Sequence, residues 1–307
     1  MMSKKLIIAC LLVLITGSTA LAQQDVMFTQ YMFNGLVLNP AYAGSHEALS
    51  ATVMAREQWT GIEGAPSTQS LAVHSPLFNE KIALGALVIN DNIGVTNETN
   101  IYFSYAYRID FGRGKLSMAL QTGLGQYNNA LSEVFLTGGN NDNSFASNDV
   151  RALLPNFGAG LYYYTPRFYA GFSVPHILNN EYDRSNATTI AKQIRHYFFT
   201  TGYVVDVNHW LKWKPNLLVK AVEGAPLSFD INSNFLLADV LWLGASWRSF
   251  DSIDLLVELQ INNQFRFGYA YDITTTELSR VNNGSHEIML NYIFKFSKEK
   301  VVTPRYF

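Results

Sequence analysis

The stretch Gln264-Phe-Arg-Phe-Gly-Tyr-Ala-Tyr271 decides the fold class of this chain. Aromatic residues occupy every second position of the stretch, and between them stand Gln264, Arg266, Gly268 and Ala270. Because successive side chains of a strand point to opposite faces of the sheet, this period of two predicts a β-strand. One face of the strand would be aromatic, and the other would be polar or small.

Working outward, the same alternation recurs in Ile101–Ile109, Ile253–Ile261 and His286–Phe296. Each run has roughly ten residues, which is the length of a tilted strand that crosses a membrane. Along the whole chain, the period and the turn signals predict about 14 strands. Their expected ranges are 48–58, 67–76, 82–90, 99–109, 115–127, 156–164, 167–174, 195–206, 213–222, 228–236, 240–247, 252–261, 264–272 and 286–296.

The connections between the expected strands alternate in length. Those after even-numbered strands are tight, as at 110–114 and 262–263, whereas several after odd-numbered strands are long, as at 128–155, 175–194 and 273–285. Outer-membrane barrels have an even strand number, short periplasmic turns and long extracellular loops. The sequence therefore predicts an all-β fold, a transmembrane antiparallel up-and-down β-barrel over residues 47–297. It would be integral to the outer membrane, with both termini in the periplasm.

The composition favours this barrel over a soluble β-sandwich or propeller. Charged residues make up 15% of the chain, against a typical ~25%, and faces rich in Phe, Tyr, Leu and Ile run along nearly all of it. A soluble sandwich would keep polar residues on its outward faces, and no propeller-like repeat of about 40 residues is present. Closing the sheet also removes the edge strands that an open apolar sheet would expose.

The first residues predict an exported protein. Lys4 and Lys5 precede an apolar run over 6–15, and Ala20-Leu21-Ala22 is a small-x-small cleavage site. Residues 1–22 are therefore expected to be a signal peptide that is cleaved before Gln23. The only cysteine, Cys10, lies in this segment, so the mature chain would hold neither a disulfide nor a thiolate metal site.

The sequence carries no enzyme signature, which indicates a non-enzymatic protein without a cofactor or metal. G-x-S-x-G, Walker, H-E-x-x-H and dinucleotide motifs are absent. A barrel hydrolase is disfavoured because His74, His176 and His196 have no obvious paired serine. The Asn- and Asp-rich stretch 140–149 fits no EF-hand spacing. The expected mature chain has 20 Lys and Arg against 24 Asp and Glu, a balance that does not support nucleic-acid binding.

Four segments resemble the PorP/SprF family of Bacteroidetes outer-membrane proteins. They are Phe28–Asn34 continuing to Asn39–Gly44, then Arg56–Thr68, Gly284–Ile288 and the C-terminal Pro304–Phe307. The resemblance implies a barrel of the type IX secretion system, which is either part of the translocon or a surface anchor for secreted proteins, including gliding adhesins. The implied partners are a secreted protein with a type IX sorting domain, translocon or periplasmic subunits, and outer-membrane lipid.

The expected topology brings two of these segments together. Arg56–Thr68 is the first extracellular connection, Gly284–Glu287 enters the last strand from outside, and closure pairs the first strand with the last. Our hypothesis is a partner-binding surface at this seam, formed by Trp59, Gly61, Gly64, Pro66, Gly284, His286 and Glu287. The alternative is that these residues only fasten the closure of the barrel.

Residues 23–46 precede the first strand. Phe28, Tyr31, Met32 and Gly35 have rough helical spacing until Asn39-Pro40 breaks it. A barrel of about 14 strands is too wide for strand side chains alone to fill. The segment is therefore expected to plug the lumen or to meet a periplasmic partner, through the residues Tyr31, Phe33, Asn39, Pro40 and Tyr42. A tail over 298–307, basic and then aromatic, follows the last strand.

Two functional hypotheses follow. The first is a barrel that binds or anchors secreted type IX cargo or forms part of the translocon. The alternative is a transport channel for small or hydrophobic compounds. A substrate tunnel for such compounds should be apolar, whereas the expected lumen mixes Gly, Ser, Asn and Gln with charges of both signs, namely Arg56, Arg108, Lys220, Glu258, Arg266 and Lys295.

Overall fold

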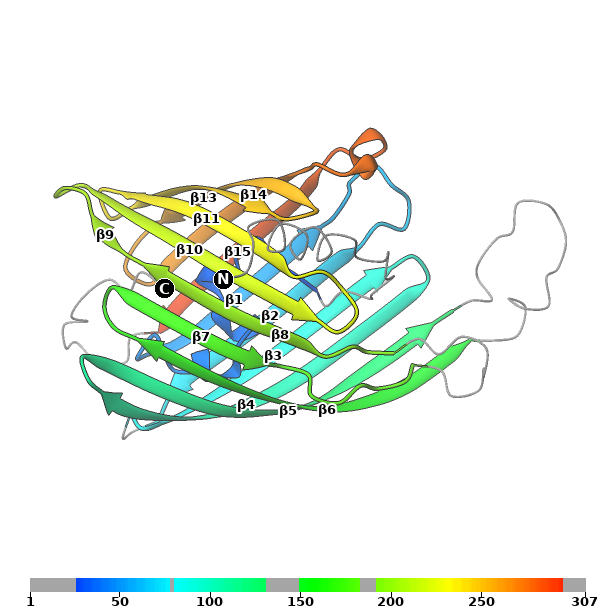
Figure 1. Cartoon of the computed structure of the whole chain (residues 1–307), viewed down its shortest axis with the longest axis horizontal. Coiled ribbons are helices and arrows are strands. Elements are labelled where there is room, and N and C mark those ends of the chain that lie inside the picture. Colours follow the sequence, from blue (N-terminus) through cyan, green and yellow to red (C-terminus); the bar gives the residue numbers. More distant parts are fainter. Residues whose placement is uncertain (1–25, 78–79, 131–148, 183–191, 295–307) are drawn as a thin grey trace, which may run out of the picture.

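The computed structural model describes residues 26–77, 80–130, 149–182 and 192–294. In this part of the chain, antiparallel strands follow one another in sequence order, and each pairs with the next, except that β8 and β9 both pair with β10. The last strand, β15, pairs with β1 from Leu49↔Phe294 to Glu57↔His286, so the sheet closes on itself. The predicted up-and-down β-barrel is confirmed (Figure 1).

The expected strand ranges all overlap with observed strands. The strands are β1 (Leu49–Glu57), β2 (Ser67–Pro76), β3 (Ile82–Ile93), β4 (Thr96–Phe111), β5 (Gly114–Asn129), β6 (Val150–Tyr164), β7 (Phe168–Val174), β8 (His196–Tyr203), β9 (Val205–Asp206), β10 (Leu211–Val222), β11 (Ser228–Leu237), β12 (Leu241–Arg248), β13 (Ser252–Gln260), β14 (Phe265–Thr274) and β15 (Ser285–Phe294).

β8 and β9 are one crossing of the barrel. Both pair with β10 in a single register, since Gly202 lies opposite Asn216 and Val205 opposite Trp213. The break in their pairing with β10 lies opposite Lys214 and Pro215, and proline has no N–H to donate to the ladder. Counting β8 and β9 together, the described residues form 14 crossings, the even number that the connection lengths predicted.

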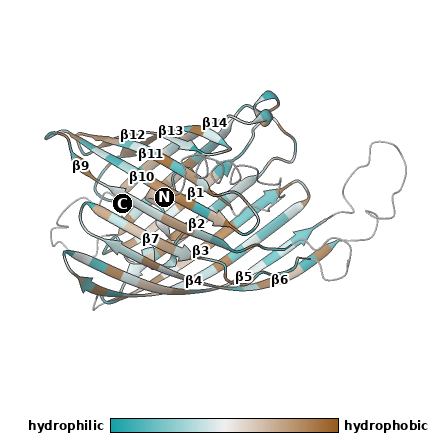
Figure 2. Ribbon diagram, viewed as in Figure 1, coloured by the Kyte–Doolittle hydropathy of each residue, from teal (hydrophilic) through white to brown (hydrophobic). Residues whose placement is uncertain are grey.

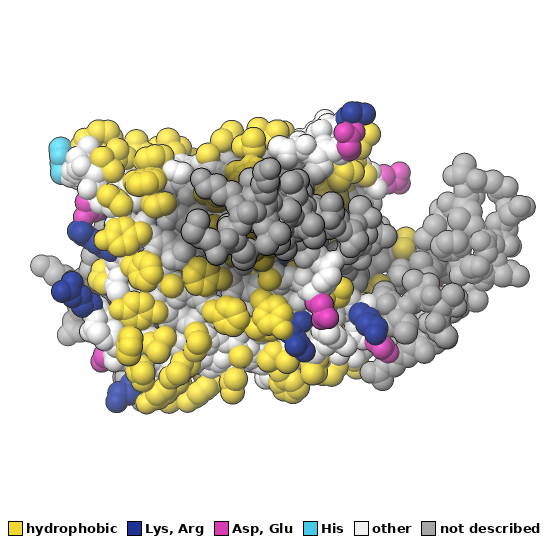
Figure 3. Space-filling view, viewed as in Figure 1, with side chains coloured by type: hydrophobic (Ala, Val, Ile, Leu, Met, Phe, Trp, Pro, Cys, Tyr) yellow, Lys and Arg dark blue, Asp and Glu magenta, His cyan; other side chains and the backbone are white. Residues whose placement is uncertain are grey.

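The two faces of the sheet have the reverse of a soluble protein's polarity. On β4, Phe103 and Tyr105 point outward and are 59% and 49% exposed, whereas Arg108 points inward and is 2% exposed. Figure 2 shows the resulting alternation of hydropathy along the strands, and Figure 3 shows apolar side chains over the outer surface, with charged residues toward the two ends. An outer surface of this kind is matched to lipid.

Four strands exceed their predicted length by three residues or more. β3, β4, β5 and β6 extend past their expected ends toward the long connections, and β6 begins at Val150 instead of residue 156. In β3, β4 and β5 the additional residues are rich in Asn and Asp, so the apolar alternation that marks a membrane strand stops before the pairing does. In β6 the additional residues are Val-Arg-Ala-Leu-Leu-Pro, which do not alternate strictly between apolar and polar. These strands form a wall that projects on one side of the barrel (Figure 1).

The N-terminal segment lies inside the barrel. It forms three short 3-10 turns, η1 (Tyr31–Phe33), η2 (Gly35–Val37) and η3 (Pro40–Tyr42), instead of a continuous helix. Nearly every residue from 28 to 46 is buried, and the segment fills the space enclosed by the strands (Figure 1). We call residues 26–46 the plug.

The plug crosses the lumen from end to end. Val26, the first described residue, lines a cavity with Ile93 and Thr96, where β3 joins β4 at the end of the barrel that carries the long connections. Phe294, the last described residue, pairs with Leu49 at the opposite, short-turn end. The described chain thus begins and ends at opposite ends of the barrel. Both termini of the chain lie outside the described residues, so their expected place in the periplasm stays a prediction.

Several expectations concern residues outside the described ranges. These are the signal peptide 1–22 with Cys10, Lys295, the tail 298–307 and most of the stretch 140–149. Within the described part of the chain, no helix has the length and apolar character needed to cross a membrane.

Candidate functional site

Glu287 fastens the start of the plug to the barrel wall. Its carboxylate accepts hydrogen bonds from the main-chain N–H groups of Thr29 (2.7 Å) and Gln30 (2.8 Å). The same carboxylate lies 3.1 Å from the Arg56 guanidinium, its neighbour across the β1–β15 pair. All of these groups are buried, so the seam between the first and last strands is also the anchor of the plug.

Two arginines neutralise a cluster of lumen carboxylates around this anchor. Arg56 lies 2.7 Å from Asp272, and Arg248 lies 3.0 Å from Asp230 and 3.9 Å from Asp254. Burying charges is expensive unless they are paired and hydrogen-bonded. Hydroxyl groups complete the cluster: Ser246 and Ser252 donate to Asp254, and Thr29 of the plug donates to Asp272.

Tyr31 and Phe33 hold the first 3-10 turn against the opposite wall. The Tyr31 hydroxyl accepts a hydrogen bond from Asn232 Nδ2 at 2.9 Å. Burial, and then the Asp230 carboxylate, raise the pKa of this plug phenol well above its ordinary value, so it stays neutral. Phe33 packs edge-on against Trp242 at 5.7 Å, and the Lys214 ammonium lies 4.8 Å from the Phe33 ring.

Asn39 and Pro40 turn the plug at mid-lumen. The Asn39 side chain caps η3 by accepting from Ala41 N, and it donates to Leu161 O on β6, both at 2.9 Å. Pro40 occupies the first position of the turn, where no N–H is needed. Gly160 makes room for this contact, since a Cβ there would lie 2.1 Å from Asn39 Oδ1.

Tyr42 and Gly44 hold the end of the plug near the short turns. Tyr42 bonds His46 Nε2 at 3.0 Å and packs edge-on against His74. Gly44 donates to His74 Nδ1 and accepts from Arg108 at 2.6 Å. All five predicted plug residues (Tyr31, Phe33, Asn39, Pro40, Tyr42) are therefore buried inside the lumen.

The connection between β1 and β2, residues 58–66, extends the seam above the sheet; we call it the seam loop. Thr60 N donates to Gly284 O and Asn283 N donates to Thr60 O, both at 2.8 Å, and Trp59 N donates to Ser285 Oγ. On its other side, Gly64 O accepts from Gly94 N in the β3–β4 turn. The loop is thus held on two sides by main-chain hydrogen bonds.

Five of the seven residues predicted to form the seam surface lie in connections between strands, and the other two, His286 and Glu287, lie on β15. Trp59 and Pro66 lie in the seam loop together with Gly61 and Gly64, whose φ angles are +96° and +73°. Gly284 also has positive φ (+84°), and a Cβ there would lie 2.7 Å from Asp272 O. The backbone therefore requires at least these three glycines, independently of any partner.

His286 and Glu287 point to opposite faces of β15. His286 is half-buried on the outer face, where its Nδ1 lies 2.7 Å from the Tyr269 hydroxyl. Glu287 is fully buried in the lumen, so its assignment to a partner-binding surface is corrected: it binds the plug. Arg248 and Asp272 were missed, because their role depends on strand register and leaves no motif in the sequence.

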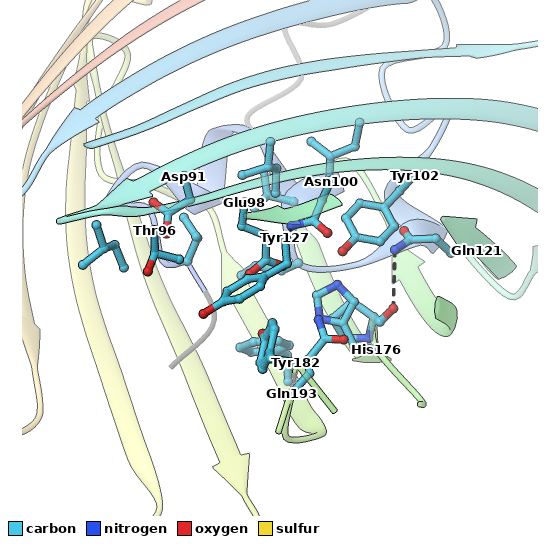
Figure 4. A pocket seen from close by; sticks show the side chains of 18 residues that line it. Asp91, Thr96, Glu98, Asn100, Tyr102, Gln121, Tyr127, His176, Tyr182 and Gln193 are labelled. Carbon is cyan, nitrogen blue, oxygen red and sulfur yellow. Dashed lines mark hydrogen bonds between the residues drawn. The ribbon is translucent and has the colours of Figure 1, made fainter. Parts of the chain in front are cut away.

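A cavity of about 120 Å³ opens above the plug at the long-loop end; we call it the vestibule. Figure 4 shows side chains from β3, β4 and β5 facing those of the β7–β8 connection across it, with His176 and Tyr182 on the latter. No group of three or more His, Cys, Asp or Glu side chains within the described ranges is arranged to hold a metal ion.

The closed sheet, the apolar outer face and the polar, plugged lumen together define a membrane β-barrel. The model of the family described as Type IX secretion system membrane protein PorP/SprF matches residues 20–292, and the chain belongs to this family. The protein is therefore an outer-membrane barrel associated with type IX secretion, as the sequence resemblance implied.

The chain is similar in fold to solved structures of low sequence identity. The CymD monoaromatic hydrocarbon channel is 11% identical with a TM-score of 0.50, over 85% of this chain and 92% of that one. Acinetobacter baumannii Omp33 is 7% identical with a TM-score of 0.48, over 81% and 98%. At such identities, the likeness to CymD shows the fold alone. No curated protein matches the chain.

Proposed function

We propose that this barrel binds a secreted protein or a translocon subunit of the type IX system at its long-loop end, through the seam loop. In this proposal the short turns face the periplasm and the long connections face outward, as in other outer-membrane barrels. The C-terminal end of the barrel then faces the periplasm, and the plug begins on the outer side.

The observation that carries the proposal is the seam loop's fixed geometry. Pairing of β1 with β15 up to Glu57↔His286 already closes the barrel. The hydrogen bonds of Thr60 with Gly284 and Asn283 lie beyond this closure. Trp59 has φ +47°, a rare conformation for a bulky residue. Backbone strain of this kind concentrates at functional sites, and a rigid aromatic side chain loses little entropy on binding.

The plug supports a docking role over transport. It occupies the lumen from Val26 to His46, and Glu287, Asn39 and Arg108 hold it near its start, middle and end. A route through the barrel would require breaking these buried contacts. Binding at the rim requires none of them to break.

A photo-crosslinking residue at Trp59 tests the proposal in the native outer membrane. Trp247 is the matched control, since it is a 49% exposed tryptophan on the outer face of β12. We expect the probe at position 59 to capture a type IX substrate or translocon subunit, and the probe at position 247 to capture lipid. Capture at position 59 of the barrel's own connections alone would leave only the closure role.

The channel hypothesis has one observation in its favour. The vestibule is floored by the apolar plug residues Val37 and Leu38 and by Phe198, so a small apolar compound has a place to enter. Transport would then need the plug to move. Uptake of monoaromatic compounds into liposomes that contain the intact barrel would favour this second function, and uptake no faster than in empty liposomes would exclude it.

A further inference from the structure

The vestibule is graded from apolar at its floor to acidic at its mouth. Val37 and Leu38 of the plug form the floor. Two aromatic pairs line the sides: Tyr102 with His176, whose ring centroids are 5.2 Å apart, and Tyr127 with Tyr182, at 4.5 Å. Figure 4 shows these pairs facing one another across the space from different strands and connections.

Two carboxylates stand on the projecting wall near the mouth. Asp91 accepts a hydrogen bond from Thr68, and Glu98 accepts one from Asn100 at 2.9 Å. The described lining contains neither Lys nor Arg. The side chains of Asn100, Gln121 and Gln193 add hydrogen-bonding groups between the carboxylates and the floor.

This gradient matches a long cationic side chain. The methylene stem of a Lys or Arg can lie along tyrosine rings while its charged head reaches a carboxylate. A cation over an aromatic face gains further attraction. The amide side chains suit the peptide groups on either side of such a residue. An apolar compound alone would match the floor but not the acidic mouth.

The vestibule is continuous with the seam loop. Gly94, which joins β3 to β4 between the lining residues Ile93 and Thr96, donates its N–H to Gly64 O of the seam loop at 2.9 Å. Thr68, which donates to Asp91, is the second residue of β2, which follows that loop directly. A partner seated on the seam loop is therefore within reach of the vestibule mouth.

We infer that the vestibule binds an extended segment of the docked protein by a Lys or Arg side chain, with its charge between Asp91 and Glu98. The inference rests on the proposed function, to which it adds the chemistry that is recognised. The segment enters as far as the plug, which forms a floor and blocks further passage.

A photo-crosslinking residue at Ile93, which is 49% exposed at the mouth, tests this inference in the full-length barrel in its native membrane. We expect a secreted protein to be captured, with a Lys or Arg within the crosslinked peptide. Adding Asp91→Asn with Glu98→Gln should lower the yield about tenfold, since each charge-assisted contact is replaced by a neutral one. Glu57→Gln, which removes an exposed outer-face carboxylate, should leave the yield unchanged.

Three results would overturn the inference. The first is a captured peptide without a basic residue. The second is a crosslinking yield that the double substitution does not change, in a barrel whose heat-modifiable migration on a gel shows that it is folded. The third is capture of lipid or of the barrel's own chain alone. A parallel probe at Trp59 distinguishes failure of the vestibule inference from failure of the proposed docking function. If it captures a type IX protein while the Ile93 probe does not, the vestibule inference alone fails. If neither probe captures one, the docking function fails with it.

Discussion

At the scale of single residues, Glu287 connects three parts of the molecule. It belongs to the last strand, pairs across the seam with Arg56 of the first strand, and accepts the main-chain N–H groups of Thr29 and Gln30 in the plug. A carboxylate with this many donors is stable although it is fully buried. Its side chain therefore makes barrel closure and plug docking depend on one another.

Replacing Glu287 with Gln should destabilise the barrel by about 3 kcal/mol, because it leaves the buried Arg56 with one carboxylate fewer. The neutral amide also accepts the plug N–H groups more weakly. Equilibrium unfolding in guanidinium chloride, from phospholipid vesicles, measures the change. Glu57→Gln is the control, since Glu57 lies on the exposed face of β1 directly before the seam loop, and it should change stability by less than about 0.5 kcal/mol. Equal effects of the two variants would contradict the assigned role of Glu287.

Asn39→Ala removes both the cap of η3 and the bond to Leu161 O. Loss of a cap costs about 0.5–2 kcal/mol, so we expect the plug to open more often and proteolysis within it to accelerate. Asn180→Ala is the matched control, since exposed Asn180 also donates to a main-chain oxygen, that of Pro155. Unchanged proteolysis in Asn39→Ala would show that the turn is held by packing alone.

At the scale of elements, the strands were predictable and the plug was predictable only in part. Aromatic residues at every second position mark β14, and Ile288, Leu290, Tyr292 and Phe294 at every second position mark β15. The same rule underestimates β6, because its first residues, Val150–Pro155, do not alternate strictly between apolar and polar side chains. The width of the barrel predicts that the plug lies in the lumen. Its three 3-10 turns and its passage across the whole lumen were not predictable, because they depend on contacts between distant residues, such as Glu287 with Thr29, 258 positions apart.

The alternation rule also predicts where the side chains of the seam residues His286 and Glu287 point. His286 and Glu287 are neighbours on a strand, and neighbours point to opposite faces. One of them had to enter the lumen. The sequence hypothesis placed both residues at the rim, because they share a segment that resembles the family. The structure places their side chains on opposite faces of β15, as the rule requires.

Deleting residues 23–44 removes the plug and should raise the ion conductance of the barrel. The lumen of a barrel with 14 crossings is too wide for the strand side chains alone to fill. Without the plug, an open aqueous path should therefore run through the barrel. Single-channel recording in planar bilayers compares the deletion with the full mature chain. Conductance that stays at the level of the full chain, in a folded barrel, would contradict a sealing role for the plug.

At the scale of the whole molecule, the barrel is an inside-out protein with its charges paired in the lumen and its aromatic and aliphatic residues toward lipid. Leu255, 50% exposed on β13, belongs to the outward face. The sequence predicted this arrangement because both faces of each strand can be read directly from the period of two. The pairing of individual charges could not be read, since it depends on the register of strands distant in sequence.

Leu255→Arg should destabilise the folded barrel in phospholipid by about 2–4 kcal/mol, the cost of a charge near the middle of the bilayer. Val281→Arg provides the comparison, since Val281 is 63% exposed in the β14–β15 connection and should tolerate the charge. Urea titration in vesicles reports both. Similar stability of the two variants would argue that the β13 face does not meet lipid.

The measurement that tests the central claim most directly is purification of the intact barrel from gently solubilised native outer membrane, with the co-purifying proteins identified by mass spectrometry. The docking account predicts a secreted protein with a type IX sorting domain, or translocon subunits, and their loss in Trp59→Ala with the barrel still folded. Recovery of the barrel alone, under conditions that keep other outer-membrane complexes intact, would contradict it.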